Sequence, residues 1–372
     1  MTIGGLWIAP IAVPLPVVLM GGAGAVVATA AVLSAWAAHH PELPTRRWSR
    51  PLPASLCRGV DARATRIALR ALGLVAGVAG IVTLAGLNAP VDGVVAIVVV
   101  TAVSMVAGPV IPVFDPIRVF DPLRTSPARP SGAPDGHHEH HRPKNHAAAD
   151  VRTAAVWSAV FCAIALSAHD PRLLAATATG YVLLRLVGAR RGLSDRSDPV
   201  GALAELMAHL APIGRNRDGL LAWRNPLVAV AHAEPPLGAV DLGAVVTAAS
   251  LTHAALQHPT WLTGLANPIS AVVLFGVVLA VVAGVLRLAL IRPFLRSATV
   301  PMVAAYGIVA AGRWLPPLDV LAFVALHMLA IGVLHRQALA RYDLRTARAV
   351  QFPTRIVLVL SVISGLTLLV AR

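Results

Sequence analysis

Charged residues are scarce in this sequence. Only 13% of its 372 residues are Asp, Glu, Lys or Arg, whereas 57% are hydrophobic. Soluble domains carry about 25% charged residues, so this chain has too little polar surface to cover a water-soluble fold. A lipid bilayer accepts such a chain because it acts as an apolar solvent. The composition therefore excludes a soluble globular protein and predicts one that resides in a membrane.

Cysteine is also scarce, and several catalytic motifs are missing. The two cysteines, Cys57 and Cys162, lie in a basic loop and in an apolar segment, and no CxxC occurs. We therefore expect no disulfide and no cysteine-based zinc or iron–sulfur site. The chain also lacks a Walker A loop, HExxH, GxSxG, CxxCH and a GxGxxG placed after a strand, so nothing indicates the enzyme classes that use them.

Aromatic residues make up only 5% of the chain, and lysine occurs once, at Lys144, among 31 basic residues. The basic loops show no regular interleaving of aromatic residues, so they provide no base-stacking platform for nucleic acid. The net charge of +14 fits the arginine-rich cytoplasmic loops of a membrane protein better. We expect the lipid bilayer and other membrane subunits as partners, and no nucleic acid.

Ten apolar segments come close to the ~20 residues that a membrane-spanning helix needs. They are residues 15–37, 67–87, 93–111, 153–168, 171–188, 239–256, 270–291, 298–312, 318–335 and 354–370. Only helices and closed barrels satisfy the backbone in lipid, and runs of this length exclude a barrel. The predicted fold class is an all-α bundle of about ten transmembrane helices, forming a single domain over residues 1–372.

The basic residues give the orientation of this bundle. With the N-terminus outside, every basic residue except Arg172, Arg313 and Arg372 falls at the inner face. The positive-inside rule therefore predicts both termini outside, in the cytoplasmic (inner) membrane. The first apolar segment has no basic residue before it and a basic cluster after it, at Arg46 to Arg50, which is typical of an anchor and not of a cleaved signal.

Two inner loops are long. Residues 112–151 are rich in His, Pro and Arg, and we expect them to be largely disordered. Residues 189–238 are expected to be more ordered and to contain an amphipathic helix in the membrane interface, with one apolar face formed by Leu203, Leu206, Met207 and Leu210. Four helix starts are marked by an Asp or Asn before a proline, at Asp170-Pro171, Asp198-Pro199, Asn225-Pro226 and Asn267-Pro268.

Several ionisable residues fall inside the predicted helices. His327 lies about 13 Å into its segment, where the adjacent side chains offer no polar partner, so another helix or a trapped water must supply one. His335 lies about 12 Å further along, too far to share one metal ion with His327. The two mark either a polar path through the membrane or helix–helix hydrogen bonds. The other ionisable residues inside predicted helices lie near the inner helix ends, and one of the arginines is expected to pair with the aspartate. These residues are Asp241, Arg70, Arg185 and Arg287.

Two groups of histidines are candidate ligands for a transition metal, Zn or Cu. The first is a tract in the loop 112–151, which is either disordered with incidental affinity or a metal-sensing or metal-delivery segment; it contains His137, His138, His140 and His141. The second faces outside and contains His169, His253 and His258. The alternative to a metal site here is that these histidines simply lie at the membrane interface beside an aromatic belt.

Three stretches carry a resemblance: Asp121 to Thr125, Asp198 to Leu227, and His327 to Leu339. They resemble a family of actinobacterial multi-pass membrane proteins that are often labelled "fenitrothion hydrolase" or hypothetical membrane protein, in order from about residue 60 to the end. The resemblance implies a helical membrane fold. Arg336 stands where the family has Asp, and the stretch matching Thr252-His253, which has His253 here, usually carries Asp, which weakens the transfer of a carboxylate-dependent activity.

Three functions remain open on the sequence. A transport or permeation protein, or a membrane subunit of a larger complex, requires His327 to face a cavity between helices; the run Gly21-Gly22-Ala23-Gly24 permits the necessary close packing. A membrane-embedded, metal-assisted hydrolase requires three outer histidines within reach of one point. An assembly or scaffold subunit requires a large apolar face that is not covered by lipid.

Overall fold

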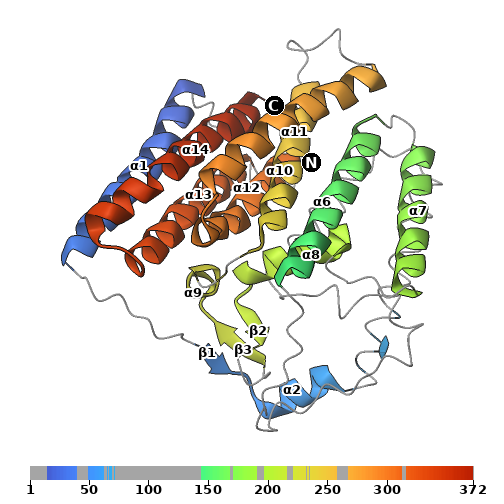
Figure 1. The fold of residues 1–372 in the computed structure, drawn as a ribbon, viewed down its shortest axis with the longest axis horizontal. Helices are drawn as coiled ribbons and strands as arrows, with labels where there is room; N and C mark the ends of the chain where they lie inside the picture. The colour runs from blue at the N-terminus through green and yellow to red at the C-terminus, as the bar shows by residue number, and fades with distance from the viewer. Residues whose placement is uncertain are drawn as a thin grey trace, which may run out of the picture.

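The computed structural model describes residues 15–39, 49–62, 65, 67–68, 71, 144–167, 171–190, 197–215, 221–231, 233, 235–257, 267–311 and 316–371. Its long helices are α1 (Leu15–His39), α6 (Lys144–Ser167), α7 (Pro171–Arg190), α10 (Leu237–Gln257), α11 (Pro268–Ala289), α12 (Thr299–Ala311), α13 (Pro316–Leu339) and α14 (Leu344–Ala371). Figure 1 shows α1, α13 and α14 at one side of the bundle, α10, α11 and α12 beside them, and α6 and then α7 at the opposite side.

Among the described residues, five helices are long and apolar enough to cross a membrane, as expected of a helical membrane protein. The spans are Asp150–Ser167, Leu237–Leu256, Pro268–Ala289, Asp319–Leu339 and Leu344–Leu369, and α1 contributes the shorter apolar stretch Met20–Leu33. The most apolar of them, in α11, exposes a row of aliphatic side chains that suits contact with acyl chains; its members include Ile269, Val273, Val277, Val281 and Leu288. The predicted segment 93–111 and nearly all of 67–87 lie outside the described residues.

Helix α12 differs from its prediction as a transmembrane segment. It has 13 residues, or about 20 Å of rise, which is less than the ~30 Å of a hydrocarbon core. A short 3-10 helix, η4 (Pro293–Ala298), leads into it. Val300, Ala305 and Val309 have no exposed surface, and α10 and α13 pack against α12. Residues 299–311 therefore form an internal helix, and their apolar character reflects burial by other helices.

Glycines allow the closest approaches between these helices. On α14, a Cβ at Gly365 would overlap the ring of Phe323 on α13. On α1, a Cβ at Gly22 would overlap Leu366 of α14, whereas Gly21 and Gly24 have nothing within 4 Å. Only one glycine of the N-terminal run therefore serves the close helix packing that the sequence suggested.

A three-stranded antiparallel sheet was not predicted. Its strands are β1 (Ser49–Pro51), β2 (Ile213–Arg215) and β3 (Leu221–Arg224), in the order β1-β3-β2. Each strand has only three or four residues, which is too few for an alternating pattern to reveal it. The sheet joins the predicted first and third inner loops, below the bundle and beside α2 (Ala54–Asp61) in Figure 1. This pairing requires both loops to lie on one side of the membrane, as the predicted topology has them.

The loop 189–238 is folded over its described residues, which are 189–190, 197–215, 221–231, 233 and 235–238. It contains α8 (Pro199–Met207), η3 (Ala208–Leu210) and α9 (Pro226–Ala231). The four apolar residues that were assigned to one face of α8 are all buried. Helices α7, α8, α9 and α11 begin at the predicted prolines, and the side chains of Asp198 and Asn267 accept hydrogen bonds from the main chain as caps.

One loop boundary was wrong. Residues 144–151, which were assigned to the disordered loop 112–151, form the first turns of α6, and the rest of that loop lies outside the described residues. The polar start of α6 hides this extension from a search for apolar runs. The segment predicted as 153–168 is therefore part of a 24-residue helix, long enough to cross a ~30 Å core.

Cysteine labelling tests the predicted orientation. Arg58 on α2 and Arg172 on α7 are both exposed, and they lie on opposite sides of the predicted topology. We expect a membrane-impermeant thiol reagent to label Arg172→Cys in intact cells and Arg58→Cys only after permeabilisation. The unmodified chain is the control, since Cys57 is buried and Cys162 is partly buried. Rapid labelling of Arg58→Cys in intact cells would overturn the orientation.

Candidate functional site

A polar cluster lies in the interior of the described bundle. It consists of His327 from α13, Ser361 from α14 and Tyr306 from α12, which are 0%, 8% and 2% exposed. The short turn between α13 and α14 makes these helices neighbours, so that the middle of one lies beside the middle of the other (Figure 1). His327 therefore faces the bundle interior, the orientation that its predicted depth in the membrane requires.

The hydrogen bonds fix the tautomer of His327. Its Nδ1 lies 2.9 Å from the carbonyl oxygen of Phe323, one turn earlier on α13. Because a carbonyl only accepts, Nδ1 carries a proton, and in the neutral ring Nε2 is an acceptor. Nε2 lies 2.9 Å from Oγ of Ser361. A partner on another helix, here Ser361, agrees with the sequence prediction. The second partner, the Phe323 carbonyl on the same helix, was not predicted, because the sequence argument concerns side chains alone.

The same atoms allow two complete sets of hydrogen bonds. Tyr306 Oη lies 3.0 Å from Ser361 Oγ and 3.2 Å from the Ser361 carbonyl oxygen. With a neutral ring, Tyr306 donates to Ser361 Oγ, which donates to His327 Nε2. With a proton on Nε2, His327 donates to Ser361 Oγ, which donates to Tyr306, which donates to the Ser361 carbonyl. Rotation of two hydroxyl groups connects the two sets, and neither leaves a donor unpaired.

Aromatic packing surrounds this cluster. The ring of Phe323 lies 4.5 Å from that of His327 and 5.8 Å from that of Tyr306, measured between centroids. A fourth helix joins through Ser250 of α10, whose Oγ donates to the Tyr306 carbonyl at 3.0 Å. The hydroxyl of Ser250 is therefore bound to the backbone of α12 and takes no part in the chain of side-chain hydrogen bonds.

A charged cluster lies near the predicted inner ends of α6, α10 and α11. Arg287 Nε lies 2.7 Å from Asp241 Oδ1, and Arg152 Nε lies 3.8 Å from Oδ2. The sequence predicted one arginine partner for Asp241 without identifying it; the structure gives Arg287 as the close partner and adds Arg152. Both arginine side chains are 55% exposed, so water and headgroups screen these pairs.

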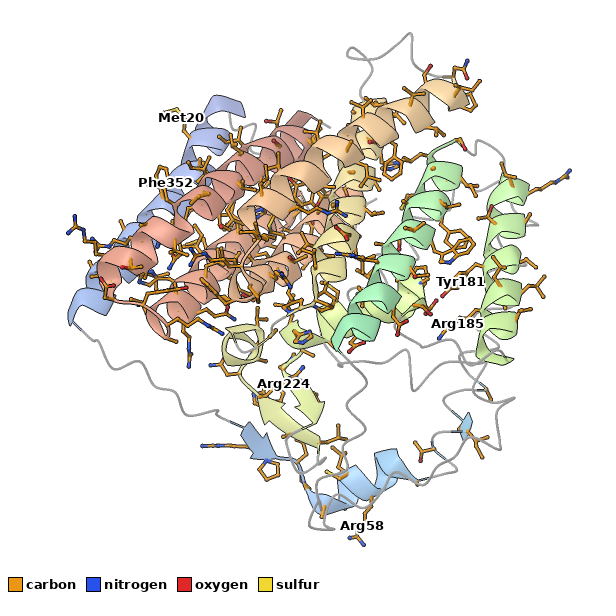
Figure 2. The ribbon with its side chains drawn as sticks, viewed as in Figure 1. Met20, Arg58, Tyr181, Arg185, Arg224 and Phe352 are labelled. Carbon is orange, nitrogen blue, oxygen red and sulfur yellow. The ribbon has the colours of Figure 1, made fainter. Side chains whose placement is uncertain are left out.

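Arg185 pairs with a different carboxylate. Its Nη1 lies 3.4 Å from Oδ2 of Asp198, the residue that caps α8, and Tyr181 donates a short hydrogen bond to the same carboxylate. Figure 2 shows Tyr181 and Arg185 directed from α7 toward the α6 and α8 side. A cap that the sequence identified therefore also attaches α7 to α8, which the sequence did not indicate.

The run from Trp223 to Leu227, part of the resemblance above, has a structural role. Arg224 donates from Nε to the Ala211 carbonyl at 2.9 Å and from Nη2 to the Ala208 carbonyl. It thereby satisfies carbonyls at the end of η3 and fastens the sheet to α8 (Figure 2). Burial lowers the pKa of the Arg224 guanidinium and that of the nearby His209 imidazole.

Most of the predicted metal ligands cannot be placed. Among them only His253, on α10, is described. The others lie outside the described residues, as does Arg70: His137, His138, His140, His141, His169 and His258. Within the described part of the chain, no group of three or more His, Cys, Asp or Glu side chains is arranged to hold a metal ion. The Zn or Cu site therefore stays a prediction.

Comparisons with protein-family models, with curated proteins and with solved structures give no match for this chain. The interpretation of the site therefore rests on its chemistry. Tyr306 and Ser361 were missed as members because hydroxyl residues are common in transmembrane helices. The signal that would have found them is the unsatisfied nitrogen of His327, which required a polar residue at the same depth on a neighbouring helix.

Proposed function

We propose that this chain is a transport or permeation protein of the cytoplasmic membrane, alone or as the membrane subunit of a larger complex, and that the cluster of His327, Ser361 and Tyr306 passes protons. The observation that carries the proposal is the pair of complete hydrogen-bond sets around His327. A group that only braces helices needs one such set. A group that accepts and releases protons needs an acceptable arrangement in each state.

The position of the cluster supports the same proposal. Ionisable residues inside a membrane are expensive and commonly mark ion or proton pathways. Two other ionisable residues lie along α13, with Asp319 eight residues before His327 and His335 eight residues after it, and each step turns about 80° around the helix axis. Asp319 to His335 covers about 24 Å of helix, which is most of a ~30 Å hydrocarbon core.

A hydrolase is less well supported. Ser361 and His327 are within hydrogen-bond distance, as a nucleophile and its base would be. However, Ser361 is only 8% exposed, and its main chain lies in the middle of α14, where amide groups bond within the helix and are not available to stabilise an oxyanion. The family resemblance, with its hydrolase label, therefore remains a proposal without a site in the described residues.

Proton flux into liposomes tests the proposed function. The purified chain is reconstituted with an internal pH-sensitive dye, and a potassium diffusion potential drives protons inward. We expect flux from the unmodified chain and only background leak from Ser361→Ala, because alanine removes the link between Tyr306 and His327. Ser250→Ala is the matched control, since this hydroxyl bonds only to backbone oxygens. Equal flux from the Ser361 and Ser250 variants would refute the relay.

A further inference from the structure

A second polar cluster lies about 12 Å along α13 from His327, and it has different chemistry. It consists of His335 from α13 and of Gln351 and Arg355 from α14. Arg355 Nη2 lies 2.7 Å from Gln351 Oε1 and 3.2 Å from His335 Nδ1. His335 and Gln351 are 3% and 0% exposed. Arginine only donates, so both neighbours act as acceptors toward it.

The cluster holds a positive charge without a negative partner. No carboxylate among the described residues pairs with Arg355; its hydrogen bonds go to a neutral amide and to an imidazole. The charged group that acts on Arg355 is another cation, Arg348, which lies seven residues earlier on α14. A partly buried guanidinium is normally balanced by a carboxylate or phosphate, because its desolvation is otherwise uncompensated.

The atoms left without a partner are donors. Three atoms of the cluster are buried and make no hydrogen bond: Nε2 of Gln351, Nε of Arg355 and Nε2 of His335, which carries the ring proton because Nδ1 accepts from Arg355. The amide of Gln351 is held with its oxygen toward Arg355, so its NH2 group is the end that is left over. Buried polar groups are nearly always paired. Three unpaired donors, one of them on an arginine without a counter-ion, call for an acceptor that carries negative charge.

We propose that Gln351 and Arg355, with Arg348 close by, form a binding site for a phosphate-class oxyanion near the inner ends of α13 and α14. Tetrahedral oxyanions match this set because they accept several hydrogen bonds at once from a guanidinium fork and an amide. The phosphate comes either from a lipid headgroup or from a soluble ion, and the exposed ring of the adjacent Phe352 (Figure 2) places the site next to lipid. The site does not involve His327 and does not depend on the proposed proton flux.

Thermal unfolding of the delipidated, full-length chain in neutral detergent tests the site. One arm adds inorganic phosphate against chloride at equal ionic strength, and the other adds phosphatidylglycerol against phosphatidylcholine. We expect a saturable rise in melting temperature in the phosphate arm if the ligand is a soluble anion, and only in the phosphatidylglycerol arm if it is a lipid. Arg355→Gln should weaken the response about tenfold or more. Arg345→Gln, which removes an exposed charge from the same helix, should preserve it.

Gln351→Glu provides a test in the opposite direction. The new carboxylate stands where the unpaired NH2 group was and acts as a built-in counter-ion for Arg355. We expect a higher melting temperature without any added anion, together with loss of the response to phosphate or phosphatidylglycerol. The proposal fails if Gln351→Glu lowers the melting temperature. It also fails if neither ligand stabilises the unmodified chain more than it stabilises Arg355→Gln.

Discussion

Replacement of His327 by alanine should destabilise the protein by about 2–4 kcal/mol. The change leaves a cavity against Phe323 and Tyr306 and removes the acceptor of the Ser361 hydroxyl. The cavity remains costly in a bilayer because packed helices are held there by van der Waals contacts and hydrogen bonds. Thermal unfolding in detergent measures the loss. His253→Gln, a change at a partly exposed histidine, controls for the loss of an imidazole as such.

His327→Gln should separate bracing from proton transfer. Glutamine can donate to the Phe323 carbonyl and accept from Ser361, so we expect a stability within about 1 kcal/mol of the unmodified chain. Its amide does not take up and release protons near neutral pH, so proton flux should fall to the background leak. Full flux from this variant would mean that His327 only braces α13 against α14. Unfolding of the variant in mild detergent would show that the cavity shape matters more than the hydrogen bonds.

Replacement of Gly238 by leucine should force α6 and α10 apart. A Cβ at this position would lie 2.7 Å from the backbone nitrogen of Arg152 and 3.0 Å from the Cβ of Val151. Backbone atoms cannot rotate away as a side chain can, so the helices must separate, at a cost of about 3 kcal/mol. The same movement would lengthen the 3.8 Å approach of Arg152 to Asp241. A fall in the melting temperature of the purified protein measures the effect.

Gly284→Leu is the matched control for Gly238→Leu. Gly284 lies on α11 with nothing within 4 Å of its added Cβ, and leucine favours a helix over glycine by roughly 0.8 kcal/mol. This variant should therefore be as stable as the unmodified chain or slightly more so. A similar loss of stability in both variants would show that α6 and α10 do not approach each other as closely as the structure has them.

The elements that could be predicted are those encoded in neighbouring residues. The Asp198 and Asn267 caps follow from a local pairing with proline, and the buried face of α8 follows from helical spacing. The internal position of α12 could not be predicted, because burial by lipid and burial by other helices select the same apolar side chains. The one indication in the sequence is that the apolar segment 298–312 is short for a membrane-spanning helix.

The candidate site was predictable in part for a related reason. The sequence identified His327 as a buried group that needs a partner, and the depth argument required that partner to come from another helix or from a trapped water. It could not choose Ser361 or Tyr306, because that choice depends on which helices are neighbours and on how far each is rotated about its axis. The same limit applied to Asp241, whose partner Arg287 is 46 residues away in sequence.

The packing of α1 sets the order in which the protein is completed. Val26 and Ala30 of α1 are buried in the main core, and the helices that cover them are α13 and α14, at the far end of the chain. At roughly 5–20 residues per second, the ribosome needs on the order of tens of seconds to synthesise the residues between them. During that interval Gly22, Val26 and Ala30 of α1 lack the partners that pack against them in the folded protein, so α1 cannot complete its packing until α13 and α14 have been synthesised.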